Sequence, residues 1–270
     1  FDSIAAVLKS ANVEYVKWDM NRSICDVYSA VLPKERQGEV YHRYVLGIYD
    51  LMERFTSSFP NILFEGCSGG GGRFDPAILY YSPQIWCSDD TDGIERLEIQ
   101  YGTSFFYPIS AVGSHVSAIP NHQTGRRTPL ATRGVVAMAG SFGYEMDLNL
   151  LTEDEKEAVK AQVEDYKKYY DLIHNGDYYR LASPQGASGF TAWQFVSGDK
   201  TRTLLNLVIT HVRANAPDLW FKLRGLDPEK RYRLEEDGRI YSGSALMNAG
   251  ISIPMIMGDY PAVQMVLTEV

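Results

Sequence analysis

The stretch VEYVKWDMN, residues 13–21, decides the fold that the sequence predicts. Side chains alternate along a β-strand, so Lys17, Asp19 and Asn21 should share one face and apolar residues the other. Residues 4–8, just before it, have apolar side chains at helical spacing. A helix followed by a short strand predicts an α/β unit, in which functional groups are usually placed at the carboxyl end of the strand. The pair Lys17 and Asp19 is therefore a candidate site, and a structural ion pair at a strand end is the alternative.

Two further apolar runs end in the same way. Residues 62–73 (ILFEGCSGGGGR) end in polar and glycine residues, and residues 85–92 (IWCSDDTD) end in three acids within four positions. Residues 39–57 have helical periodicity, which suits the crossover connection that parallel strands need. These three segments therefore predict parallel strands whose polar ends meet at one edge.

The remaining chain predicts a change of architecture near residue 182. The segments before it are interpreted as a helix at 93–107, a strand at 110–116, a buried helix at 132–142, a strand at 143–148, and a helix opened by a capping box of Thr152 and Glu155. Beyond it, β-rich runs alternate with Gly, Pro and Asp turns.

The predicted fold class is α/β. Residues 1–182 should form the later strands of a partial (β/α)8 TIM barrel, and residues 183–270 a small antiparallel β-sandwich domain. About five strand ends occur before the boundary, whereas a closed barrel needs eight. Because the sequence opens at Phe1 and its first methionine is Met20, we expect the true amino terminus and the missing strands to precede Phe1.

The composition is that of a globular chain with an acidic balance: of 270 residues, 45% are hydrophobic, and the formal net charge is -8. Phosphate binding needs a basic face, and a chain with this acidic balance, in which Arg126 and Arg127 form a short basic pair, is not expected to have a nucleic-acid partner. No stretch is long enough to span a membrane. Three cysteines without close pairing (Cys25, Cys67, Cys87) predict no disulfide framework and favour a reducing compartment. Because no signal segment is visible in the sequence either, we expect a cytoplasmic location.

Paired carboxylates at such an edge suit glycoside hydrolysis, with Asp19 and Asp89 as the pair. Lys17 should lower the pKa of Asp19, as a nucleophile requires, whereas Asp90 and Asp92 should raise the pKa of Asp89 by like-charge repulsion, as a general acid requires. An acid such as Asp92 could instead serve only as the N-cap of the following helix.

The glycine-rich loop at residues 68–73 lacks the Gly-Lys-Ser/Thr of a phosphate-binding loop, so we interpret it as allowing backbone amides to approach a sugar hydroxyl. Cys67 has no histidine nearby in sequence and is interpreted as a buried, inert thiol. No metal and no cofactor are expected, because the histidines show no ligand spacing; they are His42, His115, His122, His174 and His211.

Several long motifs extend over nearly the whole chain. They are KWDMNR (17–22), CSGGGGRFDP (67–76), WCSDDTDGIERLEIQYGTS (86–104), SHVSAIPNHQTGR (114–126) and GSFGYEMDL (140–148). With them the sequence closely resembles the α-galactosidases of glycoside hydrolase family 36. The resemblance implies a retaining enzyme that releases terminal galactose from melibiose or raffinose-type oligosaccharides.

By the same resemblance, Asp19 is the nucleophile and Asp89 the general acid/base. The galactose pocket would be lined by Lys17, Asn21, Cys67, Gly69 and Gly70. The long members of this family have an amino-terminal β-sandwich, a (β/α)8 barrel and a carboxyl-terminal β domain, and are often homotetramers. The alternatives are an α-N-acetylgalactosaminidase or a transglycosylase with the same carboxylates, or an inactive fragment that lacks the first barrel strands.

Overall fold

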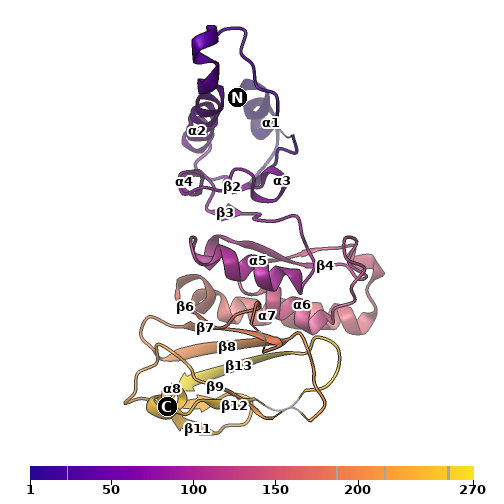
Figure 1. The fold of residues 1–270 in the computed structure, drawn as a ribbon, viewed down its shortest axis with the longest axis vertical. Helices are drawn as coiled ribbons and strands as arrows, with labels where there is room; N and C mark the ends of the chain where they lie inside the picture. The colour runs from indigo at the N-terminus through magenta and orange to yellow at the C-terminus, as the bar shows by residue number, and fades with distance from the viewer. Residues whose placement is uncertain (23, 187, 216, 254–255) are drawn as a thin grey trace. The chain divides into compact units, whose positions relative to one another are not determined.

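The computed structural model describes residues 1–22, 24–186, 188–215, 217–253 and 256–270. The chain forms two compact units, residues 1–89 and residues 90–270 (Figure 1).

The first unit is built around a parallel sheet with strand order β1-β2-β3. Trp18 pairs with Gly66, and Gly66 pairs with Ile85, so the three strands end at the same edge. The elements of this unit are α1 (Asp2–Ser10), β1 (Tyr15–Trp18), the 3₁₀ helix η1 (Lys34–Glu39), α2 (Val40–Ser58), β2 (Leu63–Gly66), α3 (Ser68–Gly71), α4 (Ile78–Tyr81) and β3 (Gln84–Ile85).

Helices cover one face of this sheet. Phe55 of α2 is fully buried, and its ring centre lies 5.3 Å from that of Trp18 and 6.0 Å from that of Phe64. The next residue along each strand faces the other way, so Lys17 and Glu65 project from the opposite face. The alternation predicted for residues 13–21 therefore separates an apolar, helix-covered face from a polar one. The buried core of the unit comprises Leu8, Met52, Phe55, Phe64, Ile78 and Ile85.

The second unit begins with a parallel pair, β4 and β5, and ends with antiparallel strands. The predicted capping box is confirmed, since the Thr152 side chain accepts from the Glu155 amide and the Glu155 side chain accepts from the Thr152 amide. The elements up to the last long helix are α5 (Glu95–Thr103), η2 (Ile109–Ala111), β4 (Gly113–Ser117), α6 (Leu130–Ala137), β5 (Ser141–Glu145), η3 (Leu148–Leu150) and α7 (Glu153–Asn175). They are followed by β6 (Asp177–Ala182), β7 (Phe190–Val196), β8 (Arg202–Ile209), β9 (Leu219–Phe221), β10 (Arg231–Leu234), β11 (Ile240–Ser242), α8 (Gly243–Asn248), β12 (Ile251–Ile253) and β13 (Ala262–Glu269).

The prediction of one helix over 132–142 was wrong in its second half. Helix α6 ends at Ala137, and strand β5 begins at Ser141. Gly140 lies directly against the neighbouring strand, because a Cβ atom on it would lie only 2.3 Å from the carbonyl oxygen of Val112. The absence of a side chain there lets the chain turn from helix to strand beside β4.

The antiparallel sheet has the order β11-β10-β13-β8-β7-β6. Helices α6 and α7 contact β7, β8 and β13, and Figure 1 shows the two helices lying over these strands. Side chains from the opposite face share a core with residues of β9, β12 and α8. Residues 191–196 of β7 are therefore buried on both faces, and the polar Thr191 and Gln194 are buried together with the apolar residues.

The parallel strands precede the antiparallel ones, in the order that the sequence predicts. Strand β6, residues 177–182, already pairs with β7, so the antiparallel sheet starts six residues before the predicted boundary. The division after residue 182 stays a prediction. Within the described ranges the parallel strands form an open three-stranded sheet and a separate pair, and no closed barrel.

Candidate active site

Three segments that contain candidate site residues follow directly on the ends of the parallel strands. Asp19 comes after β1, Cys67 after β2, and Trp86 after β3. Because the strands are parallel and in register at Trp18, Gly66 and Ile85, these next residues lie along the same sheet edge.

The Asp19 carboxylate is surrounded by hydrogen-bond donors. Its Oδ1 accepts from the backbone N–H groups of Met20 at 2.8 Å, Ser68 at 3.0 Å and Gly69 at 3.1 Å. Its Oδ2 accepts from the side-chain amide of Asn21 at 2.7 Å. The carboxylate is thereby fixed in position while its side chain remains exposed.

The amides that reach Asp19 come from a turn of left-handed helix. Residues 68–71 all have positive φ, from 60° to 94°, and the N–H groups of Gly71 and Gly72 donate to the carbonyl groups of Cys67 and Ser68. Glycine adopts this conformation without strain, which explains the run of glycines after β2. Successive amides in such a turn form a concave anion-binding surface, and here they bind the Asp19 carboxylate.

Asp89 is held from two sides. Its Oδ1 accepts a hydrogen bond of 3.0 Å from the indole Nε1 of buried Trp86. A Cβ atom on Gly70 would lie 2.4 Å from the backbone nitrogen of Asp89. Neighbouring glycines of one turn thus contact both acids: Gly69 donates to Asp19, and Gly70 packs against Asp89.

Lys17 contacts one residue on the polar face of the sheet and one at this edge. Its Nζ lies 3.9 Å from Oε1 of buried Glu65 and 4.6 Å from the centre of the Trp86 ring. Glu65 also accepts hydrogen bonds from the hydroxyl of Tyr15 and, at 3.2 Å, from the side-chain amide of Gln84. The lysine therefore has one carboxylate and one aromatic ring to orient it.

The pKa of Asp19 is lowered well below its ordinary value, as predicted, but the predicted cause was wrong. Hydrogen bonds from the Cys67 thiol and the Gly69 amide are the main causes, with smaller effects from Met20 and Asn21. Lys17 instead pairs with Glu65. Burial, and then the hydrogen bond to Asp19, raise the pKa of the Cys67 thiol, so it stays protonated and can donate.

The seven residues predicted for the site, Lys17, Asp19, Asn21, Cys67, Gly69, Gly70 and Asp89, are connected in this first unit through the contacts described above. Sequence reasoning missed Ser68, Glu65 and Trp86. Glu65 had a detectable signal, because it is an acid inside the apolar run ILFEG. The roles of Ser68 and Trp86 depend on the turn and on the strand ends, which the sequence alone does not show.

The other acids of the third segment have structural partners in the second unit. Asp92 is 1% exposed, and its Oδ1 accepts from the N–H groups of Ile94 at 2.8 Å and Glu95 at 3.3 Å. Its side chain also binds Arg126 and Thr124, and Asp90 accepts from the Asp92 amide. These contacts support the alternative interpretation of Asp92 as a helix cap.

Within the described parts of the chain, no group of three or more His, Cys, Asp or Glu side chains is arranged to hold a metal ion. None of the described helices combines the length and the apolar character that crossing a bilayer requires.

Two family models match the sequence. The melibiase model matches residues 1–176, and the model of the glycosyl hydrolase family 36 C-terminal domain matches residues 190–267. The chain therefore belongs to the melibiase family, glycoside hydrolase family 36.

Similar proteins carry names that agree with this family. The bifunctional alpha-galactosidase/sucrose kinase AgaSK of Mediterraneibacter gnavus is 52% identical over 269 residues, which are 100% of this chain and 28% of that protein. Alpha-galactosidase AgaA of Geobacillus stearothermophilus is 52% identical over 259 residues, 96% of this chain and 35% of that protein. A crystal structure of an AgaA variant in complex with raffinose has a TM-score of 0.96 at 50% identity, over 100% of this chain and 37% of that one. The chain thus spans about a third of the length of these relatives.

Proposed function

We propose that this chain carries the catalytic carboxylates of a retaining α-galactosidase, which hydrolyses terminal α-linked galactose of melibiose and raffinose-type oligosaccharides by double displacement. The observation that carries the proposal is the Asp19 carboxylate, ionised and fixed by donors at the strand edge, with Asp89 packed against the same glycine turn. Relatives named alpha-galactosidases support it, as do structures of AgaA variants in complex with raffinose and stachyose.

In this mechanism Asp19 attacks the anomeric carbon and forms a covalent galactosyl ester, while Asp89 protonates the leaving oxygen. Asp89 then removes a proton from the water that hydrolyses the ester. Galactose would be bound by Lys17, Asn21, Cys67 and the exposed edge of the turn at Gly69 and Gly70. The low pKa of Asp19 suits this role, because a nucleophilic carboxylate must be ionised at the working pH.

We further propose that the parallel strands β1 to β5 are later strands of a (β/α)8 barrel, and that the antiparallel strands form a sandwich domain beyond residue 182. The parallel pairing within β1-β2-β3 and within β4-β5 supports this architecture. In a chain as long as its relatives, the remaining strands would come from outside these 270 residues. We also propose that the intact protein is a homotetramer and cytoplasmic, and size-exclusion chromatography with light scattering tests the oligomeric state.

The decisive experiment replaces Asp19 by alanine in the intact protein. We expect hydrolysis of p-nitrophenyl α-galactoside to fall by about 10⁴-fold or more, and azide to restore turnover by forming β-galactosyl azide. A matched control is Asp199→Ala, which removes a carboxylate from the hairpin between β7 and β8 and should leave turnover unchanged. An Asp19→Ala protein with normal turnover would contradict the proposal.

Product analysis separates the related activities. Faster hydrolysis of the N-acetylgalactosaminide than of the galactoside would favour an α-N-acetylgalactosaminidase, and galactosyl transfer to sucrose in place of hydrolysis would favour a transglycosylase. The isolated 270-residue chain is expected to be inactive, and clear hydrolysis by it would contradict the need for further barrel strands.

A further inference from the structure

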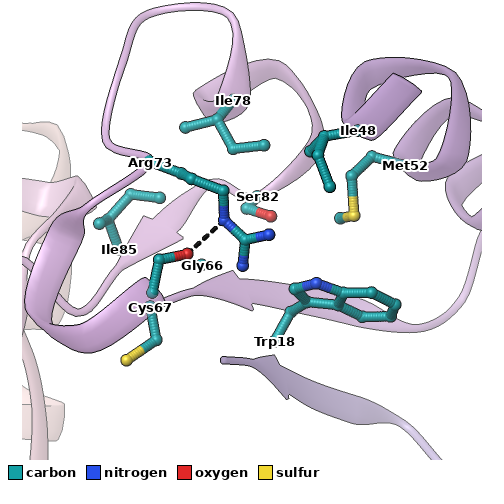
Figure 2. Close-up of a pocket in the computed structure, with 10 residues that line it drawn as sticks. Trp18, Ile48, Met52, Gly66, Cys67, Arg73, Ile78, Ser82 and Ile85 are labelled. Atoms are coloured by element: carbon teal, nitrogen blue, oxygen red, sulfur yellow. Dashed lines mark hydrogen bonds between the residues drawn. The ribbon is translucent and has the colours of Figure 1, made fainter. Parts of the chain in front are cut away.

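The side chain of Arg73 points into a small cavity on the side of the sheet that the helices cover (Figure 2). The cavity is lined largely by apolar side chains, and its lining residues include no Asp or Glu. A guanidinium in such surroundings is costly unless it makes hydrogen bonds that compensate for lost water. The lining residues that surround it are Trp18, Ile48, Met52, Ile78 and Ile85.

Arg73 makes a hydrogen bond to the glycine turn. Its Nε donates to the hydroxyl oxygen of Ser68, drawn as the dashed line in Figure 2. Ser68 is 7% exposed and has a φ of 70°. It is the non-glycine residue of the left-handed turn, and a residue with a Cβ atom resists this conformation.

Ser68 also contacts the nucleophile. Its backbone N–H donates to Asp19 Oδ1 at 3.0 Å, and the next amide, that of Gly69, donates to the same oxygen at 3.1 Å. Both amides point at Asp19 because Ser68 is in the left-handed conformation. If Ser68 returned to negative φ, these two donors would turn away from the carboxylate.

We propose that Arg73 is a positioning residue for the nucleophile: by binding the Ser68 hydroxyl from behind the turn, it holds Ser68 in the left-handed conformation that aims two amides at Asp19. This inference rests on the proposed role of Asp19 in catalysis. It explains why an arginine follows the four glycines of the motif CSGGGGRFDP although its side chain points into the cavity beside Trp18 and Ile78.

The test uses two pairs of variants in the intact protein. Arg73→Met removes the donor and fits an apolar cavity, and Ser68→Ala removes the acceptor but keeps the strained Cβ. Both should lower kcat/KM about tenfold or more and move its acidic limb to higher pH, because Asp19 loses donors that stabilise its charge. Ser68→Gly should cost much less, since glycine adopts positive φ without help. The double variant Arg73→Met/Ser68→Gly should then recover most of the activity lost in Arg73→Met.

Two results would overturn the proposal. One is an Arg73→Met protein with a lower melting temperature but an unchanged acidic limb, which is what a purely structural role predicts. The other is a crystal structure of Arg73→Met in which Ser68 keeps its φ and its bond to Asp19. If Arg73→Met does not fold, the kcat/KM values of Ser68→Ala and Ser68→Gly are compared instead. Equal values for these two variants contradict the proposal. The crystal structure needs no turnover, so it tests the positioning role even if Asp19 proves not to be the nucleophile.

Discussion

The parallel sheet of the first unit and the six-stranded antiparallel sheet of the second differ in strand length, in buried residues and in the backbone that follows the strands. The parallel strands are two to four residues long, contain a buried glutamate, and lead into four successive residues of positive φ. Strands β7, β8 and β13 are seven or eight residues long and pack apolar side chains into a continuous core. Sequence and local preference agree in the second region and conflict in the first, as is expected where residues are retained for function.

The largest effect is expected from removing the second carboxylate of the first region. Asp89→Ala should lower kcat for melibiose by about 10³-fold, because the leaving sugar oxygen needs a proton. For p-nitrophenyl α-galactoside the loss in the first step should be smaller, since nitrophenolate leaves without protonation. The neighbouring Asp90→Ala variant is the control, and a greater loss there than at Asp89 would contradict the assignment.

The antiparallel region should respond in stability and not in chemistry. Leu207 on β8 is fully buried in the core, so Leu207→Ala should lower the free energy of unfolding by about 3 kcal/mol, through lost burial and the cavity left behind. Urea denaturation measures this, with Val7→Ala as an exposed control expected to change stability by less than about 0.5 kcal/mol. The kcat per folded molecule should stay constant, and a fall in kcat would show that the scaffold affects the site.

Two glycines with nearly the same φ test whether the glycine turn is special. Gly70 has a φ of 75°, and Gly238, between β10 and β11, has a φ of 76°. An added Cβ at Gly238 meets no atom within 4 Å, whereas at Gly70 it would lie 2.4 Å from the Asp89 nitrogen. Gly238→Ala should cost about 1 kcal/mol of stability and no activity. Gly70→Ala should in addition lower kcat/KM by about 10²-fold, because Asp89 must move; equal activity in both variants would refute this.

The smallest expected effect concerns Asp199 in the hairpin between β7 and β8. Hydrogen bonds from the Ser197 hydroxyl and the Thr201 amide and hydroxyl lower the pKa of Asp199 to about 2. Since the folded pKa is below the unfolded one, this carboxylate stabilises the fold above pH of about 4, and the contribution disappears as the pH falls through 2. Wild type should therefore be more stable than Asp199→Asn at pH 7, with the difference shrinking towards pH 2. Thermal unfolding at several pH values measures it, and a difference independent of pH would exclude this cause.

Much of this organisation could be predicted from the sequence, because it depends on local periodicity. Alternation along residues 13–21 places Lys17 and Trp18 on the two opposite faces of the sheet, and the capping box fixes the start of α7. The acids and glycines at the strand ends identified the edge that holds the candidate site. The start of β5 was missed, since it depends on the contact of Gly140 with Val112, a neighbour far along the chain.

The site contacts that the sequence did not predict all join residues distant along the chain. The amide of Ser68 reaches Asp19 across 49 positions, so the direction of the Asp19 pKa shift could be argued from charge but its donors could not. Lys17 is opposite Glu65 only in the parallel register of β1 and β2, and periodicity within one segment contains no information about register. The hydrogen bond from Trp86 to Asp89 spans only three residues, but it depends on how the chain turns after β3.

The two oxygens of Asp19 have unequal partners, and this has a consequence for the second half of the proposed double displacement. Oδ1 accepts three backbone amides, whereas Oδ2 accepts the side chain of Asn21. If Oδ2 forms the bond to the sugar, Oδ1 becomes the carbonyl oxygen of the ester and is already polarised by rigid donors. The same amides then stabilise the charge that returns to the carboxylate as water displaces it, so the turn would favour breakdown of the intermediate as well as its formation.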